Sequence, residues 1–89
     1  MGKVVWTDYL RHRAHLREFE PAAVERIVLY SEERYFDISS QRMVAVGRSD
    51  SRLVVIPYEQ EGENFTPVTI HATTRQQINF RLKTGRFKP

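Results

Sequence analysis

The chain has 89 residues, of which 40% are hydrophobic and 28% charged, a composition typical of one small globular domain spanning residues 1–89. It contains no cysteine, which excludes disulfides and thiolate metal ligands. The formal net charge is +3, and the basic excess lies in the last third, where no acidic residue follows Glu63 but five basic ones do: Arg75, Arg81, Lys83, Arg86 and Lys88. A basic segment without acids attracts polyanions and points toward nucleic acid.

The first 30 residues predict one short strand and two helices. Residues 3–6 are β-rich, and Thr7 is a suitable N-cap for a helix that runs to about Arg17. Pro21 fits the first position of a second helix. That helix has one apolar face, because its aliphatic residues recur at spacings of three and four: Val24, Ile27 and Val28.

The middle of the chain predicts an antiparallel meander. Residues 34–38, 42–48 and 52–59 are rich in β-branched and aromatic side chains, and the segments 39–41 and 49–51 between them are short enough for hairpins. The third strand should be central in the sheet, because it is apolar on both faces over four residues: Leu53, Val54, Val55 and Ile56.

The C-terminal third predicts a loop, a strand and a helix. Residues 59–66 are polar and contain a glycine, so we expect an exposed, mobile loop there. Residues 68–73 read as a strand. Thr74 then has the capping-box spacing of a helix N-cap, the helix runs to Lys83, and Gly85 fits its C-terminal cap.

These elements predict an α+β fold, with two N-terminal helices packed on a four- to five-stranded, mainly antiparallel sheet and a C-terminal helix. A chain this short buries a modest share of its surface, so we expect a homodimer or a hetero-complex. No apolar run approaches the ~20 residues of a membrane span, and the N-terminus lacks the apolar core of a signal peptide. We therefore expect a cytoplasmic protein that does not enter a membrane.

Four stretches resemble a known family in their order along the chain. Trp6, followed by Thr7 and Asp8, precedes the two predicted helices. Phe19-Glu20-Pro21 stands at the start of the second one. The later three stretches are a strand ending in Gly47, the following core strand, and a strand-to-helix junction: residues 42–49, 52–58 and 70–73. Together they resemble the BrnT-type toxins of the RelE ribonuclease superfamily, the toxic halves of bacterial type II toxin-antitoxin pairs.

The resemblance implies a metal-independent endoribonuclease toxin, a hydrolase without cofactors that cleaves RNA by attack of the 2'-hydroxyl. It also implies a cognate small antitoxin protein as partner. The chain departs from the family pattern at the junction, with Thr73 in place of an arginine, and Gln76 and Gln77 where a glutamate is expected. The alternative is a non-catalytic RNA- or protein-binding module of the same fold.

Three residues are catalytic candidates for such a ribonuclease. His71 suits proton transfer because a histidine side chain ordinarily titrates near neutral pH, and strand alternation places it opposite the apolar residues. Arg75 follows the predicted N-cap, where a helix N-terminus adds to the attraction for phosphate. Tyr58 could donate a proton or stack on a base. For each residue the alternative is structural: a solvent-facing strand or helix position, or core packing.

Four further basic residues are candidates for binding RNA phosphates: Arg48, Arg81, Lys83 and Arg86. His12 and His15 are spaced by three on the first predicted helix and resemble half of a metal site. Three arginines surround that pair and would repel a cation, so we expect no metal: Arg11, Arg13 and Arg17. This helix face could instead meet RNA or the antitoxin.

Overall fold

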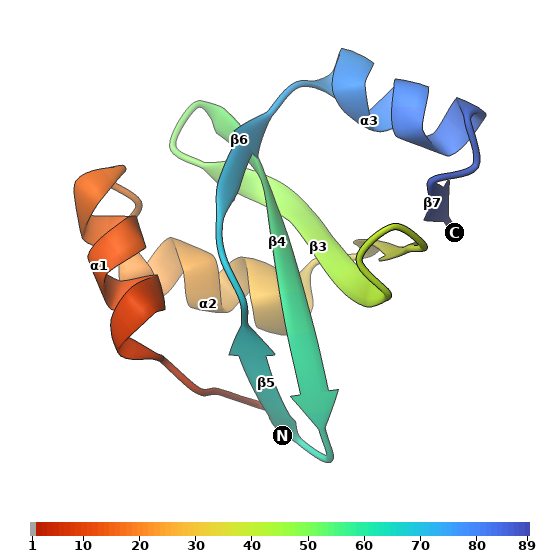
Figure 1. Cartoon of the computed structure of the whole chain (residues 1–89). Helices are drawn as coiled ribbons and strands as arrows, with labels where there is room; N and C mark the ends of the chain where they lie inside the picture. The colour runs from red at the N-terminus through yellow and green to blue at the C-terminus, as the bar shows by residue number, and fades with distance from the viewer. Residues whose placement is uncertain (1) are drawn as a thin grey trace.

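The computed structural model describes residues 2–89, which form three helices and seven strands (Figure 1). The helices are α1 (Asp8–Leu16), α2 (Pro21–Tyr30) and α3 (Arg75–Lys83). The strands are β1 (Lys3–Val4), β2 (Glu33–Asp37), β3 (Arg42–Ser49), β4 (Arg52–Glu61), β5 (Asn64–Pro67), β6 (His71–Thr73) and β7 (Phe87–Lys88).

All seven strands belong to one mixed sheet in the order β1-β5-β4-β3-β2-β7, and β6 pairs with β4 beside β5. Every pairing is antiparallel except that of β1 with β5. The predicted α+β fold is confirmed, with two strands that the sequence did not predict, β5 and β7. The central place of β4 is also confirmed, since β3 lies on one side of it and β5 and β6 on the other.

The predicted loop over residues 59–66 is wrong. β4 continues to Glu61, and β5 pairs back on it with Phe65 opposite Gln60. Gly62 makes this tight hairpin with a φ of +61°, a left-handed conformation that glycine adopts without a steric penalty. The segment is polar because both strands lie at the end of the sheet, where their side chains are mostly exposed. Polarity alone therefore gave the wrong assignment.

The helix caps follow the sequence signals. The Thr7 side chain accepts a hydrogen bond from the Leu10 amide, and the Thr74 side chain accepts one from the Gln77 amide. These bonds satisfy amides that have no partner within the helix. Gly85, with a φ of +82°, follows α3 as predicted.

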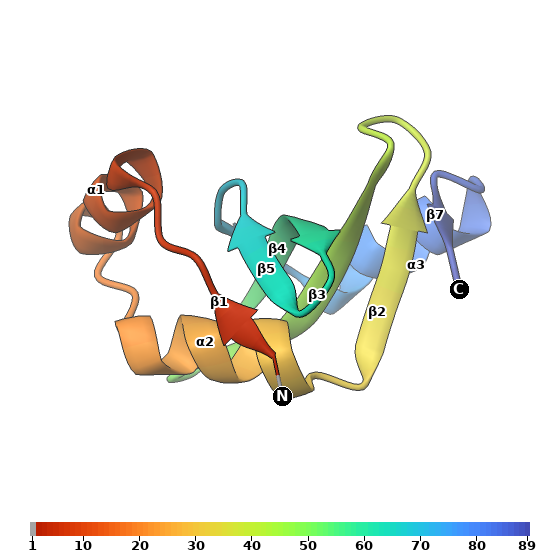
Figure 2. The same ribbon diagram turned by 90° about the horizontal axis from the view of Figure 1, so that it is seen from below.

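The sheet buries a different apolar cluster on each face. α1 and α2 cover one face, and their cluster includes Leu10, Phe19, Val28, Val54, Ile56 and Ile70. α3 covers the other face, where the edge strand β7 contributes Phe87, and the cluster there includes Val44, Val46, Leu53, Val55, Ile78 and Phe87. Both views place α1 and α3 at opposite ends of the molecule with the sheet between them (Figure 1, Figure 2). Burying each of these side chains contributes roughly 1.5–3 kcal/mol to folding.

Gly47 explains how closely α2 lies on the sheet. A Cβ at this position would be 2.6 Å from Cγ1 of Ile27, which is nearer than two non-bonded carbon atoms can approach. The glycine thus serves helix packing. Within residues 2–89, no helix is long and apolar enough to cross a membrane.

Candidate nucleic-acid interface

A cleft of about 440 Å³ lies between α3 and the sheet face that α3 covers. Its walls come from strands β2, β3, β4 and β6, from α3 and from the segment before β7. The titratable side chains that line it are Asp37, Arg42, His71, Arg81 and Arg86. The cleft therefore combines a histidine with three arginines and one carboxylate.

His71 lies on β6 directly opposite Val55 of β4, on the face that α3 covers. Nη2 of Arg13 lies 3.2 Å from Nδ1 of the histidine, and Nε of Arg13 donates a 3.1 Å hydrogen bond to the carbonyl of Ile70. A guanidinium can only donate, so Nδ1 must accept, and the proton of the neutral ring is on Nε2. Arg13 thus fixes the tautomer of His71.

The surroundings lower the pKa of His71 below its ordinary value of 6.5. The residue is exposed overall, yet partial desolvation of its ring is the largest cause. The positive charges of Arg13, Arg17 and Arg81 act in the same direction. His71 is therefore neutral at pH 7, beside a cationic group that favours a bound anion.

Arg81 is the α3 cation best placed to meet a ligand in this cleft. It lies over the Phe87 ring, with 5.4 Å between the guanidinium carbon and the ring centroid. No acidic side chain in residues 2–89 forms an ion pair with Arg81, Arg13 or Arg17. These three cations and His71 form what we call the His71 anion site.

Two other cleft arginines are already paired. Arg86 donates to both carboxylate oxygens of buried Asp37, at 3.1 and 3.2 Å, and Arg42 pairs with Glu59. Burial alone would raise the pKa of Asp37, but the hydrogen bonds from Arg86, the Ser39 amide and the Ser40 hydroxyl together hold that pKa below its ordinary value. Asp37 therefore stays ionised and cancels the charge of Arg86.

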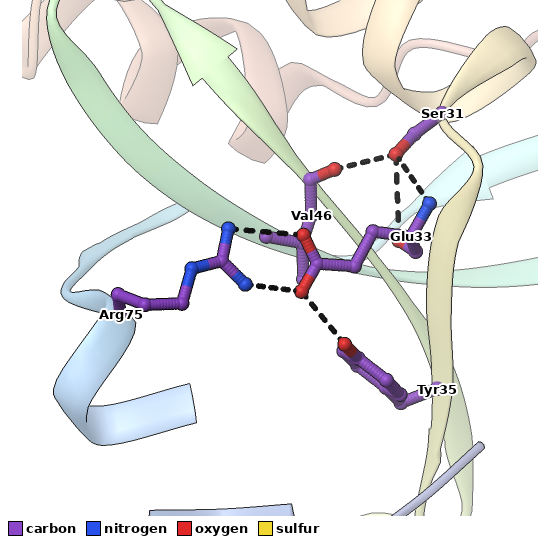
Figure 3. Close-up of polar contacts among 5 residues, drawn as sticks. All are labelled: Ser31, Glu33, Tyr35, Val46 and Arg75. Atoms are coloured by element: carbon purple, nitrogen blue, oxygen red, sulfur yellow. Dashed lines mark hydrogen bonds and ion pairs between the residues drawn. The ribbon is translucent and has the colours of Figure 1, made fainter. Parts of the chain in front are cut away.

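Arg75 does not line the His71 cleft. Its guanidinium donates to both carboxylate oxygens of Glu33, and the Tyr35 hydroxyl donates to the same carboxylate at 2.7 Å (Figure 3). The Ser31 hydroxyl donates to the carbonyl of Val46 nearby. The hydrogen bond from Arg75 is the largest cause that lowers the pKa of Glu33, so the two residues form a stable ion pair. This pair joins α3 to β2.

Tyr58 lies on the other face of the sheet from His71. It belongs to the cluster under α1 and α2, is only 4% exposed, and its hydroxyl accepts a 3.0 Å hydrogen bond from Arg34. The same Arg34 donates to the carbonyls of Val28 and Ser31 at the end of α2. Tyr58 thus supports a helix terminus, and the structure does not bring it together with His71.

Of the four predicted phosphate-binding residues, Arg81 and Arg86 line the His71 cleft. Arg48 is exposed at the turn between β3 and β4, and Lys83 is exposed near the end of α3; neither lines the cleft. The sequence alone did not identify Arg13 as a site residue. The basic face of the first helix was the available signal, but contact with a residue 58 positions away could not be read from it.

Comparisons with known protein families, with curated proteins and with solved structures found no match to this chain. The class that the fold defines is therefore a small α+β domain with a mixed sheet. Among residues 2–89, no three His, Asp or Glu side chains are grouped so that they could hold a metal ion. The side chains available for chemistry at this site are therefore His71 and the arginines of the His71 anion site.

Proposed function

We propose that this protein is a metal-independent endoribonuclease toxin, similar to the BrnT-type toxins of the RelE superfamily, and that RNA binds at the His71 anion site. The observation that carries the proposal is a neutral histidine that shares a cleft with Arg81, contacts Arg13 and feels the charge of Arg17, three cations without an acidic partner within residues 2–89. A neutral imidazole can accept a proton, and the cations can hold a phosphate. A cognate small antitoxin would cover this surface.

RNA supplies its own nucleophile, so the protein needs to bind the phosphate and move one proton. Arg81, Arg17 and Arg13 bind the scissile phosphate and stabilise its added negative charge. As Arg13 moves from the ring onto the phosphate, it frees Nδ1 of His71 to accept the proton of the 2'-hydroxyl. The 2'-oxygen then bonds to phosphorus, the bond from phosphorus to the 5'-oxygen breaks, and the 5'-oxygen takes a proton from water. The hydroxide left by that water is neutralised by the proton that His71 releases, so the ring returns to its neutral form. The products are a 2',3'-cyclic phosphate and a 5'-hydroxyl end.

One observation favours the alternative, a non-catalytic RNA-binding module. Nδ1 of His71 already accepts a hydrogen bond from Arg13 and is not free in the unbound protein. Binding without cleavage results if Arg13 remains on the ring when RNA is present. In that case the Nε2–H of His71 donates a hydrogen bond to the phosphate.

Cleavage of a 5'-labelled RNA by the purified protein in excess EDTA separates the two functions. We expect cleavage with 2',3'-cyclic phosphate ends, and a loss of at least about tenfold in His71→Ala. The matched control is His12→Ala, which removes an exposed histidine of α1 that does not line the cleft. Binding of intact RNA without cleavage would favour the binding module, and cleavage that EDTA abolishes would contradict the mechanism.

The toxin role is tested separately in a bacterial host. Induced expression should arrest growth. The proposal also expects a short adjacent reading frame that encodes the antitoxin, and its coexpression should restore growth. Arrest should also be lost in His71→Ala at an equal protein level. Arrest that His71→Ala leaves unchanged would contradict the link between toxicity and this site.

A further inference from the structure

A second concave surface is lined by residues of α1, of α2 and of the link between them. Figure 2 shows α1 on the side of the molecule away from α3. This concave surface has a volume of about 940 Å³, which is roughly twice that of the His71 cleft. We call it the α1–α2 groove. Its lining includes side chains from α1, from α2, from the link between them and from the segment before α1, and none of them lines the His71 cleft.

Apolar side chains form the base and one rim of the groove. Ala14 and Phe19 are buried at its base, and Trp6 is half-buried beside them. Leu16, at the last position of α1, is 64% exposed. Leu16 therefore adds exposed apolar surface to the rim of the groove.

The two walls of the groove carry opposite charges. Arg11 and His15 lie on the α1 wall, while Glu18 and Glu20 lie on the link to α2 and Glu25 lies on α2 itself. Glu25 accepts a 2.7 Å hydrogen bond from Trp6. Within residues 2–89, neither Glu18 nor Glu20 forms an ion pair. Glu18 and Glu20 are therefore available to a molecule that enters the groove, while Arg11 already lies over the Trp6 ring, with 5.8 Å between the guanidinium carbon and the ring centroid.

We propose that the α1–α2 groove is a docking surface for an amphipathic helix of a partner protein. The apolar stripe of that helix contacts Leu16, Phe19 and Trp6. Its acidic flank lies along Arg11 and His15 of α1, and its basic flank along the glutamates of the link and α2. This proposal stands independently of RNA cleavage, because the groove and the His71 cleft share no lining residue.

A helix fits this surface better than an extended peptide does. An extended peptide gains its affinity from backbone hydrogen bonds to a sheet edge, whereas this groove is bounded by two helices, whose backbone groups are bonded internally. A helix satisfies its own backbone and presents side chains at i, i+3, i+4 and i+7. A docked helix would also cover the exposed side chain of Leu16 at the end of α1.

The test is selection from a display library of helical peptides with a fixed apolar stripe and with each flank position randomised between Glu and Lys. The selected peptides should carry Glu on one flank and Lys on the other. Trp6 is the only tryptophan in the chain, so a tryptophan-free peptide should change its fluorescence on binding. Leu16→Ser should weaken the Kd by at least about tenfold.

The matched control is Phe80→Ser, which removes an exposed apolar residue of α3, 66% exposed and outside the groove, and should leave the Kd unchanged. Changing Glu18 and Glu20 to Lys together should reverse the charge preferred on the basic flank. Several outcomes would overturn the proposal: no enriched peptide, no flank preference, binding that Leu16→Ser leaves intact, or a homodimer of this chain that Leu16→Ser dissociates.

Discussion

His71 lines the cleft and contacts the guanidinium of Arg13, and these surroundings lower its pKa. Because desolvation and three arginines lower its pKa, the folded state releases the proton at a lower pH than the unfolded chain does. The stability that neutral His71 contributes is therefore complete above the unfolded pKa of about 6.5 and is lost as the pH falls toward the folded value.

The first prediction is that NMR titration of His71 will give a pKa below 6.5, and that Arg13→Gln will raise it. The rise follows because the variant removes the positive charge of Arg13, which lowers the pKa of the neighbouring histidine. The control is Arg11→Gln, which removes the same charge from an exposed position on the same helix. A pKa that is unchanged in Arg13→Gln would mean that the contact does not persist in solution.

Glu33 provides a second prediction at the residue scale. Its ion pair with Arg75 lowers its pKa below the ordinary 4.5, so its stabilising contribution is present above that value and is lost as the pH falls through the lower, folded pKa. Glu33→Gln should reduce the free energy of unfolding by roughly 1 kcal/mol at pH 7, because Arg75 is half exposed and the pair is screened. The loss should be smaller at pH 3 than at pH 7 in urea titrations. A loss of equal size at both pH values would contradict the ionic origin.

At the scale of elements, arginines outside the cleft hold the ends of the first two helices. Arg52 on β4 donates 2.7 Å hydrogen bonds to the carbonyls of Arg17 and Glu18, which follow α1. Its guanidinium carbon lies 4.1 Å from the centroid of the Phe19 ring. Arg34 makes similar bonds to the end of α2. Many of the basic residues in this chain therefore have a structural role, which total charge does not reveal.

The third prediction is that Arg52→Ala will destabilise the fold by about 1–2 kcal/mol, through the loss of two charge-assisted hydrogen bonds and one cation–π contact. Hydrogen exchange should accelerate most in α1. Arg48→Ala is the control, since this exposed neighbour of the same turn makes only a 3.4 Å side-chain hydrogen bond. Equal destabilisation in both variants would argue against the capping role.

Local sequence signals predicted the ends of the helices. The contacts that build the candidate site join residues far apart in the sequence, so the sequence alone did not predict them. Thr7, Thr74 and Gly85 each lie at the helix end that the sequence indicated, because caps depend on residues a few positions away. Residues 64–67 were missed as a strand because their pairing depends on β4. The Arg75–Glu33 pair spans 42 positions and the Arg13–His71 contact 58, so neither could be read from spacing.

At the scale of the whole molecule, the sheet separates two surfaces with different properties. Figure 1 shows α1 and α3 at opposite ends of the molecule. The face covered by α3 holds the His71 cleft, while α1, α2 and the link between them line the α1–α2 groove. α1 belongs to both, since Arg11 lines the groove while Arg13 contacts His71. Under the two proposals, RNA and a partner helix would bind at separate surfaces that share no lining residue.

The fourth prediction concerns salt. If Arg13, Arg17 and Arg81 contact phosphates, the logarithm of the RNA association constant should fall with the logarithm of salt concentration with a slope of roughly −2, because each contact to a single strand contributes about −0.7. Arg81→Gln should reduce the magnitude of this slope by about 0.7. Affinity that does not change between about 50 and 200 mM salt would contradict binding led by phosphate contacts.

The most direct test of the RNA site is an NMR titration of isotope-labelled protein with a short RNA whose 2'-hydroxyls are methylated, so that it binds without being cleaved. We predict that the largest shifts will occur at His71, Arg13, Arg81 and Gln77, which surround or contact the cleft, and that the Arg13–His71 hydrogen bond will change. Residues exposed on α2, such as Arg26, should not shift. Shifts confined to α2 or to the α1–α2 groove, with His71 unaffected at saturation, would contradict the proposed site.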